Sequence, residues 1–388
     1  MKRKEPDNSD DDDDSVIDSV ASAQETPSPL TLRNPVPQFD GRVQLYERGR
    51  VRLADGTVIE ANHTYVVNGR IGYTSTTTMI KQYFDKFNPI VVSAGMVASR
   101  KWQWNDEYRV PAEAWADREL ARRWQEHGEM MSAWSEPLQQ AARQFVSGNM
   151  HWPAFHAELC REAATSVICR EAERAMTQQF RDLCAEHIRL SWTERADLGT
   201  AMHERIEHYF EGLTTRATLE ARDEPELRQF FKWHDDGLVP QGYEPFRMEL
   251  RWYDDALQCT GSIDALFRHA GTGNLIMVDW KRSKDIRRTG FDGKLGTGPF
   301  ADLADCNYTH YALQQSMYRY MLEKHTPHRL TGMYLLICHP NQGTDYQLLP
   351  MPYLLSHIKA LYAAQNVPFV QHLCPAATDQ SDYGNDPE

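Results

Sequence analysis

Two neighbouring segments, TGSIDALFR (Thr260–Arg268) and LIMVDWKRSK (Leu275–Lys284), decide the expected fold, and the linker HAGTGN joins them. Both segments are predicted to be strands, because the linker between them is rich in turn residues. A hairpin that turns at residues 271–272 brings Asp264 directly opposite Asp279. The sequence therefore predicts a pair of facing carboxylates.

Side chains point to alternate faces of a strand, so Asp279 and Lys281 share one face of the predicted hairpin. Like charges that face each other are destabilising, and the pair Asp264 and Asp279 therefore needs a cation or a proton. A divalent metal is one candidate, and a half-buried ribbon with ordinary surface ion pairs is the alternative. The opposite face is predicted to be core and holds Ile263, Ala265, Phe267, Ile276, Val278 and Trp280.

The length of 388 residues is consistent with two domains, or with one large domain that carries additions. The formal net charge is −13, but Met1 to Leu30 alone holds nine acidic and three basic residues. After the predicted hairpin the charge reverses, which predicts a track for phosphate groups or, alternatively, a solvated face. The basic residues there are Lys281, Arg282, Lys284, Arg287, Arg288 and Lys294.

Apolar stretches in the sequence are too short to span a bilayer, and no signal-peptide core is found. We therefore expect a soluble, intracellular protein without a membrane partner, and Lys2 to Lys4 do not decide between nucleus and cytoplasm. The seven cysteines form an odd set without C-x-x-C spacing. This argues against both a disulfide framework and a zinc site.

The sequence divides into four parts. Residues 1–37 predict a disordered acidic tail that could dock a protein partner, and residues 374–388 predict a second disordered tail. Residues 38–190 predict a β-meander followed by a helical region, in which about 125–190 is an insertion. Residues 191–373 predict the core. The whole layout predicts an α/β fold with a mixed β-sheet flanked by helices, extended at its N-terminus by the meander and the helical region.

Two helical segments carry polar residues that accompany the hairpin. GTAMHERIE (Gly199–Glu207) places His203 and Glu207 on one helix face, with a surface pair on an amphipathic helix as the alternative. The later segment YALQQSMYRYMLE places Gln314 and Tyr318 on one stripe, with core packing as the alternative.

In this order the motifs resemble the RecB-type branch of the PD-(D/E)XK nuclease superfamily, which includes the RecBCD nuclease domain and relatives of phage lambda exonuclease. The resemblance covers about Thr193–Gln347 and implies a restriction-endonuclease-like core. It also implies a metal-dependent deoxyribonuclease, exonuclease-like, in DNA replication, repair or recombination. The matching residues are Gly199, His203, Glu207, Gly261, Asp264, Asp279, Lys281, Gln314 and Tyr318.

The resemblance assigns a role to each polar residue of the site. Asp264, Asp279 and Lys281 are the implied catalytic residues, and Lys281 acts chiefly through its charge on the water and the phosphate. Mg²⁺ is the implied cofactor, and Mn²⁺ is expected to substitute because imidazole suits it better. The implied metal ligands are His203, Asp264, Asp279, the backbone carbonyl of Trp280 and either Glu207 or Glu249.

DNA is the implied partner of this site. Some relatives hold an iron–sulfur cluster by a close-spaced cysteine triplet, but the C-terminal cysteines here are too far apart, so no cluster is expected. Two alternatives remain: an inactive nucleic-acid-binding or assembly protein on this fold, and a structure- or sequence-specific endonuclease. The expected DNA contacts are Gln314, Tyr318, Arg282 and Lys284.

Overall fold

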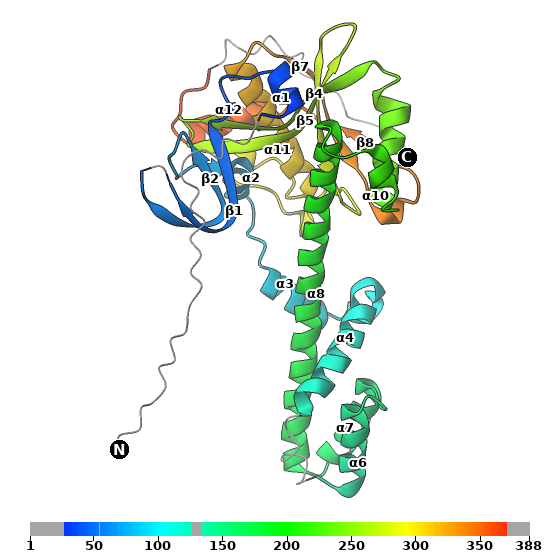
Figure 1. The fold of residues 1–388 in the computed structure, drawn as a ribbon. Coiled ribbons are helices and arrows are strands. Elements are labelled where there is room, and N and C mark those ends of the chain that lie inside the picture. The colour runs from blue at the N-terminus through cyan, green and yellow to red at the C-terminus, as the bar shows by residue number, and fades with distance from the viewer. Residues whose placement is uncertain (1–26, 54, 126–133, 371–388) are drawn as a thin grey trace, which may run out of the picture. The chain divides into compact units, whose positions relative to one another are not determined.

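The computed structural model describes residues 27–53, 55–125 and 134–370 (Figure 1). The chain forms two compact units. Unit 1 combines the segment up to Asp85 with the segment from Gly199 onward, and unit 2 is Lys86–Leu198. The sequence boundary was expected between residues 190 and 191, whereas the units join the N-terminal strands to the core. Of the two predicted tails, residues 1–26 and 374–388 lie outside the described residues.

A mixed sheet forms the centre of unit 1. Strands β4 (Tyr243–Asp254), β5 (Cys259–His269) and β6 (Leu275–Lys281) follow one another and pair antiparallel. Strand β7 (Leu330–Ile337) runs parallel to β6, and β8 (Gln347–Pro350) runs antiparallel to β7. The predicted α/β fold with a mixed sheet is thus confirmed, and the sheet is open.

One edge of β5 is shared by two strands. Strand β4 pairs along the whole of β5, so β6 and the short β3 (Thr74–Ser75) must both use its other edge. There β6 pairs with Ala265 to Arg268, and β3 pairs in parallel with Cys259 and Thr260. Among the described strands, none pairs with residues 261–264 on this edge. The sheet therefore opens at Asp264.

The hairpin of β5 and β6 has the predicted register. Ala265 pairs with Val278 as the last pair of the ladder, so Asp264 and Asp279 are the next opposite residues. The two carboxylates therefore lie just where β6 begins to leave β5.

The predicted division into a core face and a chemical face is wrong, because both faces of the sheet are covered. Leu275 and Met277 alternate in step with Asp279 but are buried in an apolar cluster. Ile263 belongs to this same cluster, although it was expected with Ala265 on the opposite side. Beside it the backbone of Glu249 has φ 43°, and the alternation of β4 is interrupted there. Polar side chains of the site therefore lie mid-strand on β4 and β5, at Glu249 and Asp264, and at the end of β6, at Asp279 and Lys281.

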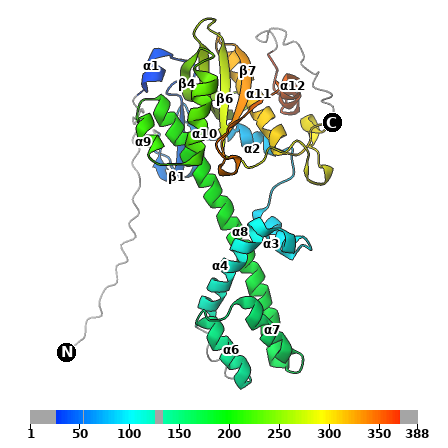
Figure 2. The same ribbon diagram turned by 90° about the vertical axis from the view of Figure 1, so that its right-hand side faces the viewer.

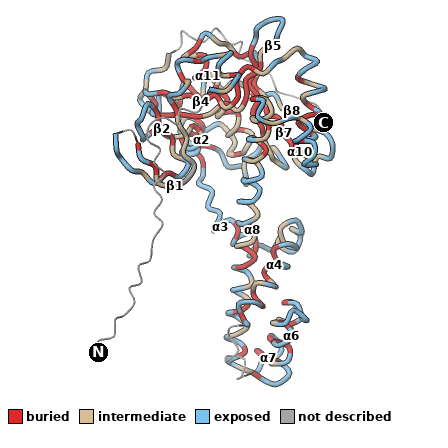
Figure 3. The backbone as a smooth tube through the Cα atoms, viewed as in Figure 1, coloured by how far each residue is buried: buried red, intermediate tan, exposed pale blue. Residues whose placement is uncertain are grey.

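Helices cover both faces of the sheet (Figures 2 and 3). The C-terminal part of α8 (Val167–Phe210) and α10 (Pro225–Trp233) share one apolar cluster with the strands. Helices α2 (Thr76–Lys81), α11 (Asn307–His325) and α12 (Leu355–Ala364) share the other. Each large apolar side chain buried in these layers contributes about 1.5–3 kcal/mol.

The described N-terminal residues are packed against the core, so the prediction of disorder was wrong for residues 27–37. Helix α1 (Pro29–Arg33) begins after Ser28, whose hydroxyl caps it. Leu30 and Val36 are each 1% exposed. The Pro- and Ser-rich composition concealed these two anchoring side chains.

The predicted β-meander forms only in part. Strands β1 (Val43–Arg52) and β2 (Val58–Val67) make a separate two-stranded sheet, and β3 joins the main sheet instead. Asn68 and Gly69 form the turn that follows β2, with φ of 49° and 76°. Helix α2 follows β3 and ends at Lys81.

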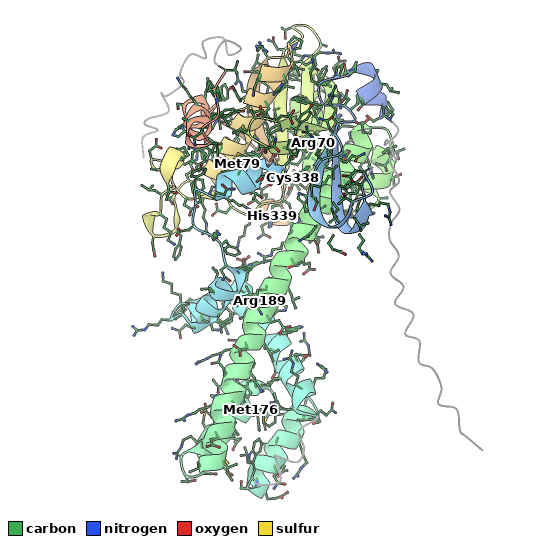
Figure 4. All side chains as sticks on the ribbon, turned by 90° about the vertical axis from the view of Figure 1, so that its left-hand side faces the viewer. Arg70, Met79, Met176, Arg189, Cys338 and His339 are labelled. Carbon is green, nitrogen blue, oxygen red and sulfur yellow. The ribbon has the colours of Figure 1, made fainter. Side chains whose placement is uncertain are left out.

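The helical region predicted after the meander is confirmed in unit 2, whose described residues form helices around one apolar cluster. Met176 of α8 is fully buried in this cluster (Figure 4). Arg189 of the same helix donates a hydrogen bond to Ser93 Oγ at 2.9 Å. Within the described part of this unit, the other helices are α3 (Pro89–Ala98), η1 (Trp102–Trp104), α4 (Asp106–Trp124), α6 (Glu136–Val146) and α7 (Trp152–Ala163).

Short helical turns complete unit 1. Within the described ranges, none of the helices of this protein has the length and apolar character needed to cross a membrane. The short elements are α9 (Arg216–Glu220), the π-helical turn η2 (His234–Leu238), and the 3₁₀ turns η3 (Phe291–Gly293), η4 (Gly298–Phe300) and η5 (Pro340–Gln342).

Candidate metal centre

Two carboxylates face each other where the sheet opens. The register of β4 and β5 places Glu249 opposite Asp264. Glu249 has a left-handed backbone, which costs a residue other than glycine about 1–3 kcal/mol. Ser262 Oγ donates a hydrogen bond to Glu249 Oε2 at 2.7 Å. The carboxylate of Glu249 is thus held in place at an energetic cost, which is typical of functional positions.

His203 of α8 meets these carboxylates. Its Nε2 donates a hydrogen bond to the backbone carbonyl of Trp280 at 2.7 Å, and its Nδ1 lies 3.4 Å from Asp264 Oδ2. The backbone N–H of Trp280 donates to the same Asp264 oxygen at 3.0 Å. One ligand atom each from His203, Glu249 and Asp264 lie within 4.8 Å of one another. A helix and two strands therefore converge on one point.

Asp279 and Lys281 form the second half of the centre. Lys281 Nζ lies 2.5 Å from Asp279 Oδ2, and the side chain of Asp279 is only 4% exposed. The ring centroid of Tyr311 lies 5.1 Å from Lys281 Nζ. The ammonium group is therefore fixed between a carboxylate and an aromatic face.

Burial raises the pKa of all three carboxyl groups, and the charge of Asp264 raises two of them further. The pKa of Glu249 is raised to about 8 by burial and by the charge of Asp264. The pKa of Asp279 is raised to about 6 by burial and by the charge of Asp264, against the opposing effect of Lys281. Burial also raises the pKa of Asp264. Without a further cation, the centre holds protons at pH values where carboxyl groups are normally ionised.

The pKa values of the two basic groups, His203 and Lys281, are shifted in opposite directions. Burial and the charge of Lys281 lower the pKa of His203 to about 4, so the imidazole is neutral at pH 7. Burial would lower the pKa of Lys281, but the charges of Asp279 and Asp264 outweigh it and raise the pKa. Lys281 is therefore a fixed positive charge, and His203 is in the form that binds metals.

The donor set fits a divalent cation. With its hydrogen on Nε2, His203 turns the lone pair of Nδ1 toward Asp264 Oδ2, and two acceptors in contact need a cation or a proton. Carboxylate and carbonyl oxygens are the ligands that Mg²⁺ and Mn²⁺ prefer. His203, Glu249 and Asp264 would hold the ion, with Asp279 beside them. The carbonyl of Trp280 accepts the imidazole hydrogen and keeps a second lone pair.

Tyr318 of α11 lies in the core near this centre, and Gln314 on the same helix is only half-buried. Gln314 Nε2 donates to the hydroxyl of Tyr318 at 2.8 Å, and Tyr318 is 4% exposed. A Cβ at Gly261 would lie 2.7 Å from the Tyr318 ring. Because its ring is enclosed, Tyr318 cannot contact DNA as predicted. It packs against Gly261 of β5 and supports the strand that carries Asp264.

Arg282 and Lys284 also differ from expectation. Arg282 forms a buried ion pair with Glu226, with Nε 2.6 Å from Oε1, so its predicted contact with phosphate is replaced by a structural role. Lys284 is exposed, as a phosphate contact requires. Arg287 pairs with Asp285, and Lys294 pairs with Asp85, so nearby acids neutralise part of the predicted basic track.

The loop after β6 presents an aromatic and a basic side chain to solvent. Phe291 is 74% exposed at the turn η3. The guanidinium of Arg288 stacks on Tyr308, 4.3 Å from the ring centroid. A hydrogen bond holds this loop to the start of α11, because the backbone N–H of Arg287 donates to Asn307 Oδ1 at 2.8 Å. The loop therefore exposes Phe291 while hydrogen bonds hold its backbone in place.

The structure decides between Glu249 and Glu207 and adds two residues, Ser262 and Tyr311, to which the sequence assigned no role. Glu249 belongs to the ligand group and Glu207 does not, although the charge of Glu207 contributes to the raised pKa of Glu249. Sequence reasoning missed Ser262, and nothing in its surroundings marked it before the register was known. Tyr311 was visible as the first residue of the Gln314 and Tyr318 stripe, but its proximity to Lys281 depends on the fold.

Comparison with models of known protein families finds no match for this chain, and no curated protein matches it. The geometry of the centre and the order of the motifs therefore carry the functional argument.

Proposed function

We propose that this protein is a metal-dependent DNA phosphodiester hydrolase of the RecB type, with a restriction-endonuclease-like core and an exonuclease-like action. The convergence of His203, Glu249 and Asp264 beside the ion pair of Asp279 and Lys281 carries the proposal. The carboxylates of this centre carry more negative charge than Lys281 balances, so they can bind a divalent cation. A bound cation and the fixed ammonium group of Lys281 are what hydrolysis of a charged ester requires.

The side chains have distinct roles in the proposed reaction. When Mg²⁺ is bound, it supplies Lewis-acid activation of water and neutralises charge on the phosphate. His203, Glu249 and Asp264 would hold the ion, and Asp279 would lie beside it in its ion pair with Lys281. His203 is itself oriented through its hydrogen bond to the carbonyl of Trp280.

Lys281 acts in this proposal as a positive charge rather than as a base. Its pKa is raised by Asp279 and Asp264, so it keeps its proton at neutral pH. The ammonium group stabilises the negative charge that develops on the phosphate oxygens during attack. The pair with Asp279 and the ring of Tyr311 hold it in position, so little reorganisation is needed.

Substrate DNA is proposed to contact the loop that follows β6. Lys284 and Arg288 are exposed and would bind backbone phosphates, which carry no sequence information. Phe291 would stack on an exposed base, as aromatic side chains do in proteins that bind single strands. The support for this orientation is that the loop begins directly after Lys281.

The decisive experiment is a cleavage assay with purified protein and Mg²⁺ or Mn²⁺. Linear and closed circular DNA, single- and double-stranded, are compared for the wild type, Lys281→Ala and the matched control Lys359→Ala, an exposed lysine of α12. We expect Lys281→Ala to lose at least about 100-fold in rate, and the control to cleave like the wild type. Circular dichroism checks that both variants fold.

Each outcome of this assay discriminates between functions. Cleavage of linear but not closed circular DNA supports the exonuclease, and discrete products from a circle indicate an endonuclease. DNA binding without cleavage by the wild type would identify an inactive binding or assembly protein. Equal cleavage by the wild type and Lys281→Ala would refute the proposed centre.

A further inference from the structure

We propose that His156, Cys160 and Glu173 form a second metal site, for a thiophilic divalent cation such as Zn²⁺, within unit 2. His156 and Cys160 lie one turn apart on α7, and Glu173 faces them from α8. One ligand atom from each lie within 4.8 Å of one another. This site is independent of the proposed nuclease centre.

A single nitrogen atom is crowded by three polar partners. His156 Nε2 lies 3.1 Å from Glu173 Oε1, 3.4 Å from Cys160 Sγ and 3.0 Å from Thr177 Oγ1. A neutral imidazole nitrogen carries either one hydrogen or one lone pair, so it cannot make three good hydrogen bonds at once. A cation would use the lone pairs of nitrogen, sulfur and oxygen together.

The spacing is close to that of a tetrahedral site. Ordinary zinc bonds of about 2.0–2.3 Å place neighbouring ligand atoms about 3.4–3.6 Å apart. The nitrogen–sulfur distance of 3.4 Å and the nitrogen–oxygen distance of 3.1 Å are slightly shorter. Small rotations of exposed or half-exposed side chains are enough to admit the ion.

Neighbouring side chains already orient the ligands. The ring of His156 stacks on Trp152 at 4.9 Å, and Trp152 stacks on Phe180 of α8 at 5.1 Å. Thr177 Oγ1 donates a hydrogen bond to Glu173 Oε1 at 3.1 Å. Contacts of this kind fix ring orientation and carboxylate position around metals. The site therefore needs little reorganisation to bind.

The chemistry of the donors selects the cation and the role. Sulfur and imidazole favour Zn²⁺ over Mg²⁺. Cys160 is exposed, whereas the other cysteines within the described residues are buried, so the fourth position is open to water. An ion held by α7 and α8 would join the two helices. The sequence argument against zinc relied on C-x-x-C spacing, which does not detect ligands that converge from two helices.

Cobalt spectroscopy on the full chain tests this site. Co²⁺ replaces Zn²⁺ and gives a near-ultraviolet charge-transfer band only when a thiolate binds it. We expect this band in the wild type, its displacement by Zn²⁺, and its loss in Cys160→Ala. Glu173→Gln should weaken Zn²⁺ binding by at least about 10-fold, since altering even an outer partner of a metal ligand costs about 10–100-fold.

Two controls make the result specific. His151→Ala removes an exposed histidine at the start of the same helix and should keep the band. His203→Ala should keep it as well, because the proposed nuclease centre has no cysteine. A wild type without the band, or a folded Cys160→Ala that retains it, would show that the three residues form only a hydrogen-bonded cluster. If Cys160→Ala does not fold, an unchanged Zn²⁺ affinity in Glu173→Gln would likewise overturn the proposed site.

Discussion

The two ligand clusters of this protein differ in burial and in donor type. The cluster at Asp264 is enclosed, and burial raises the pKa of its carboxyl groups, with a further rise at Asp279 from the charge of Asp264. The cluster at His156 is near the surface, and there the pKa of Glu173 is lowered by its hydrogen bond to the imidazole. Burial thus makes the first cluster dependent on a cation, whereas the proposed ion at the second, more exposed cluster would chiefly join α7 to α8.

The largest expected effect separates the two clusters. Asp279→Asn should lower the cleavage rate by at least about 100-fold and weaken Mn²⁺ binding measured by calorimetry, because it removes a charge at the centre. The cobalt–thiolate band should remain. Asp302→Asn, which changes an exposed carboxylate of the same unit, is the matched control. Loss of the band in Asp279→Asn would mean that the clusters are not independent.

The pH dependence of stability should have opposite signs at the two clusters. For Glu249 the pKa rises from 4.5 to about 8 on folding, so metal-free wild type loses stability as pH rises through that range. Glu249→Gln should reduce this loss, and so should saturating Mn²⁺. For Glu173 the pKa is lowered, so its contribution is present above about 4.5 and is lost as pH falls.

Thermal unfolding between pH 4 and pH 9, in chelator and in metal, measures both slopes. Glu173→Gln should reduce the loss of stability in acid and leave the slope at alkaline pH unchanged. Equal pH profiles for wild type and Glu249→Gln in chelator would show that folding does not raise the pKa of the Glu249 carboxyl group.

Substitution of Gly261 tests how tightly the cluster at Asp264 is packed, and Gly95 in unit 2 is the control. Gly261→Ala would place its Cβ 2.7 Å from the enclosed Tyr318 ring, so it should destabilise the protein by about 1–3 kcal/mol. Gly95→Ala in α3 meets nothing within 4 Å and should be neutral or slightly stabilising. Denaturant unfolding measures both. A neutral Gly261→Ala would show that Tyr318 can move away from Asp264.

The smallest effect concerns the exposed loop. Phe291→Ala should weaken binding to single-stranded DNA by about fivefold, the lower end of the energy of stacking on one base. Fluorescence anisotropy in chelator measures binding without cleavage. Leu213→Ala, which removes another exposed apolar side chain of unit 1, should bind as the wild type does. Equal binding by the two variants would exclude Phe291 from the DNA contact.

The order of strands and the site could be predicted where local signals are strong. The turn in HAGTGN fixed the register that places Asp264 near Asp279, and the lysine two residues later followed from alternation. The kink at Glu249 could not be predicted, because a left-handed glutamate is unfavourable locally and is imposed by the surrounding fold. The sequence analysis also did not predict that helices cover both faces of the sheet. Leu275 and Met277 are followed on their own face by the charged Asp279, which made that face look exposed to solvent.

Sequence reasoning also failed where a role depends on burial. Arg282 and Tyr318 have the side-chain chemistry of DNA contacts, but one is paired with Glu226 and the other lies beneath Gly261. Leu30 and Val36 lie in a stretch whose composition indicates disorder, yet their buried side chains anchor it. Such outcomes depend on partners more than 50 residues away in the chain, which no local pattern encodes.

The peptide groups of Trp280 have a consequence for mutagenesis. Its N–H holds Asp264 and its carbonyl holds His203, while its ring is buried in the apolar cluster that the strands share with α8 and α10. Side-chain substitution at position 280 changes packing and leaves both of these bonds chemically available, and only proline deletes the donor. A scan of single substitutions would therefore score position 280 as a packing residue and overlook its part in aligning the centre.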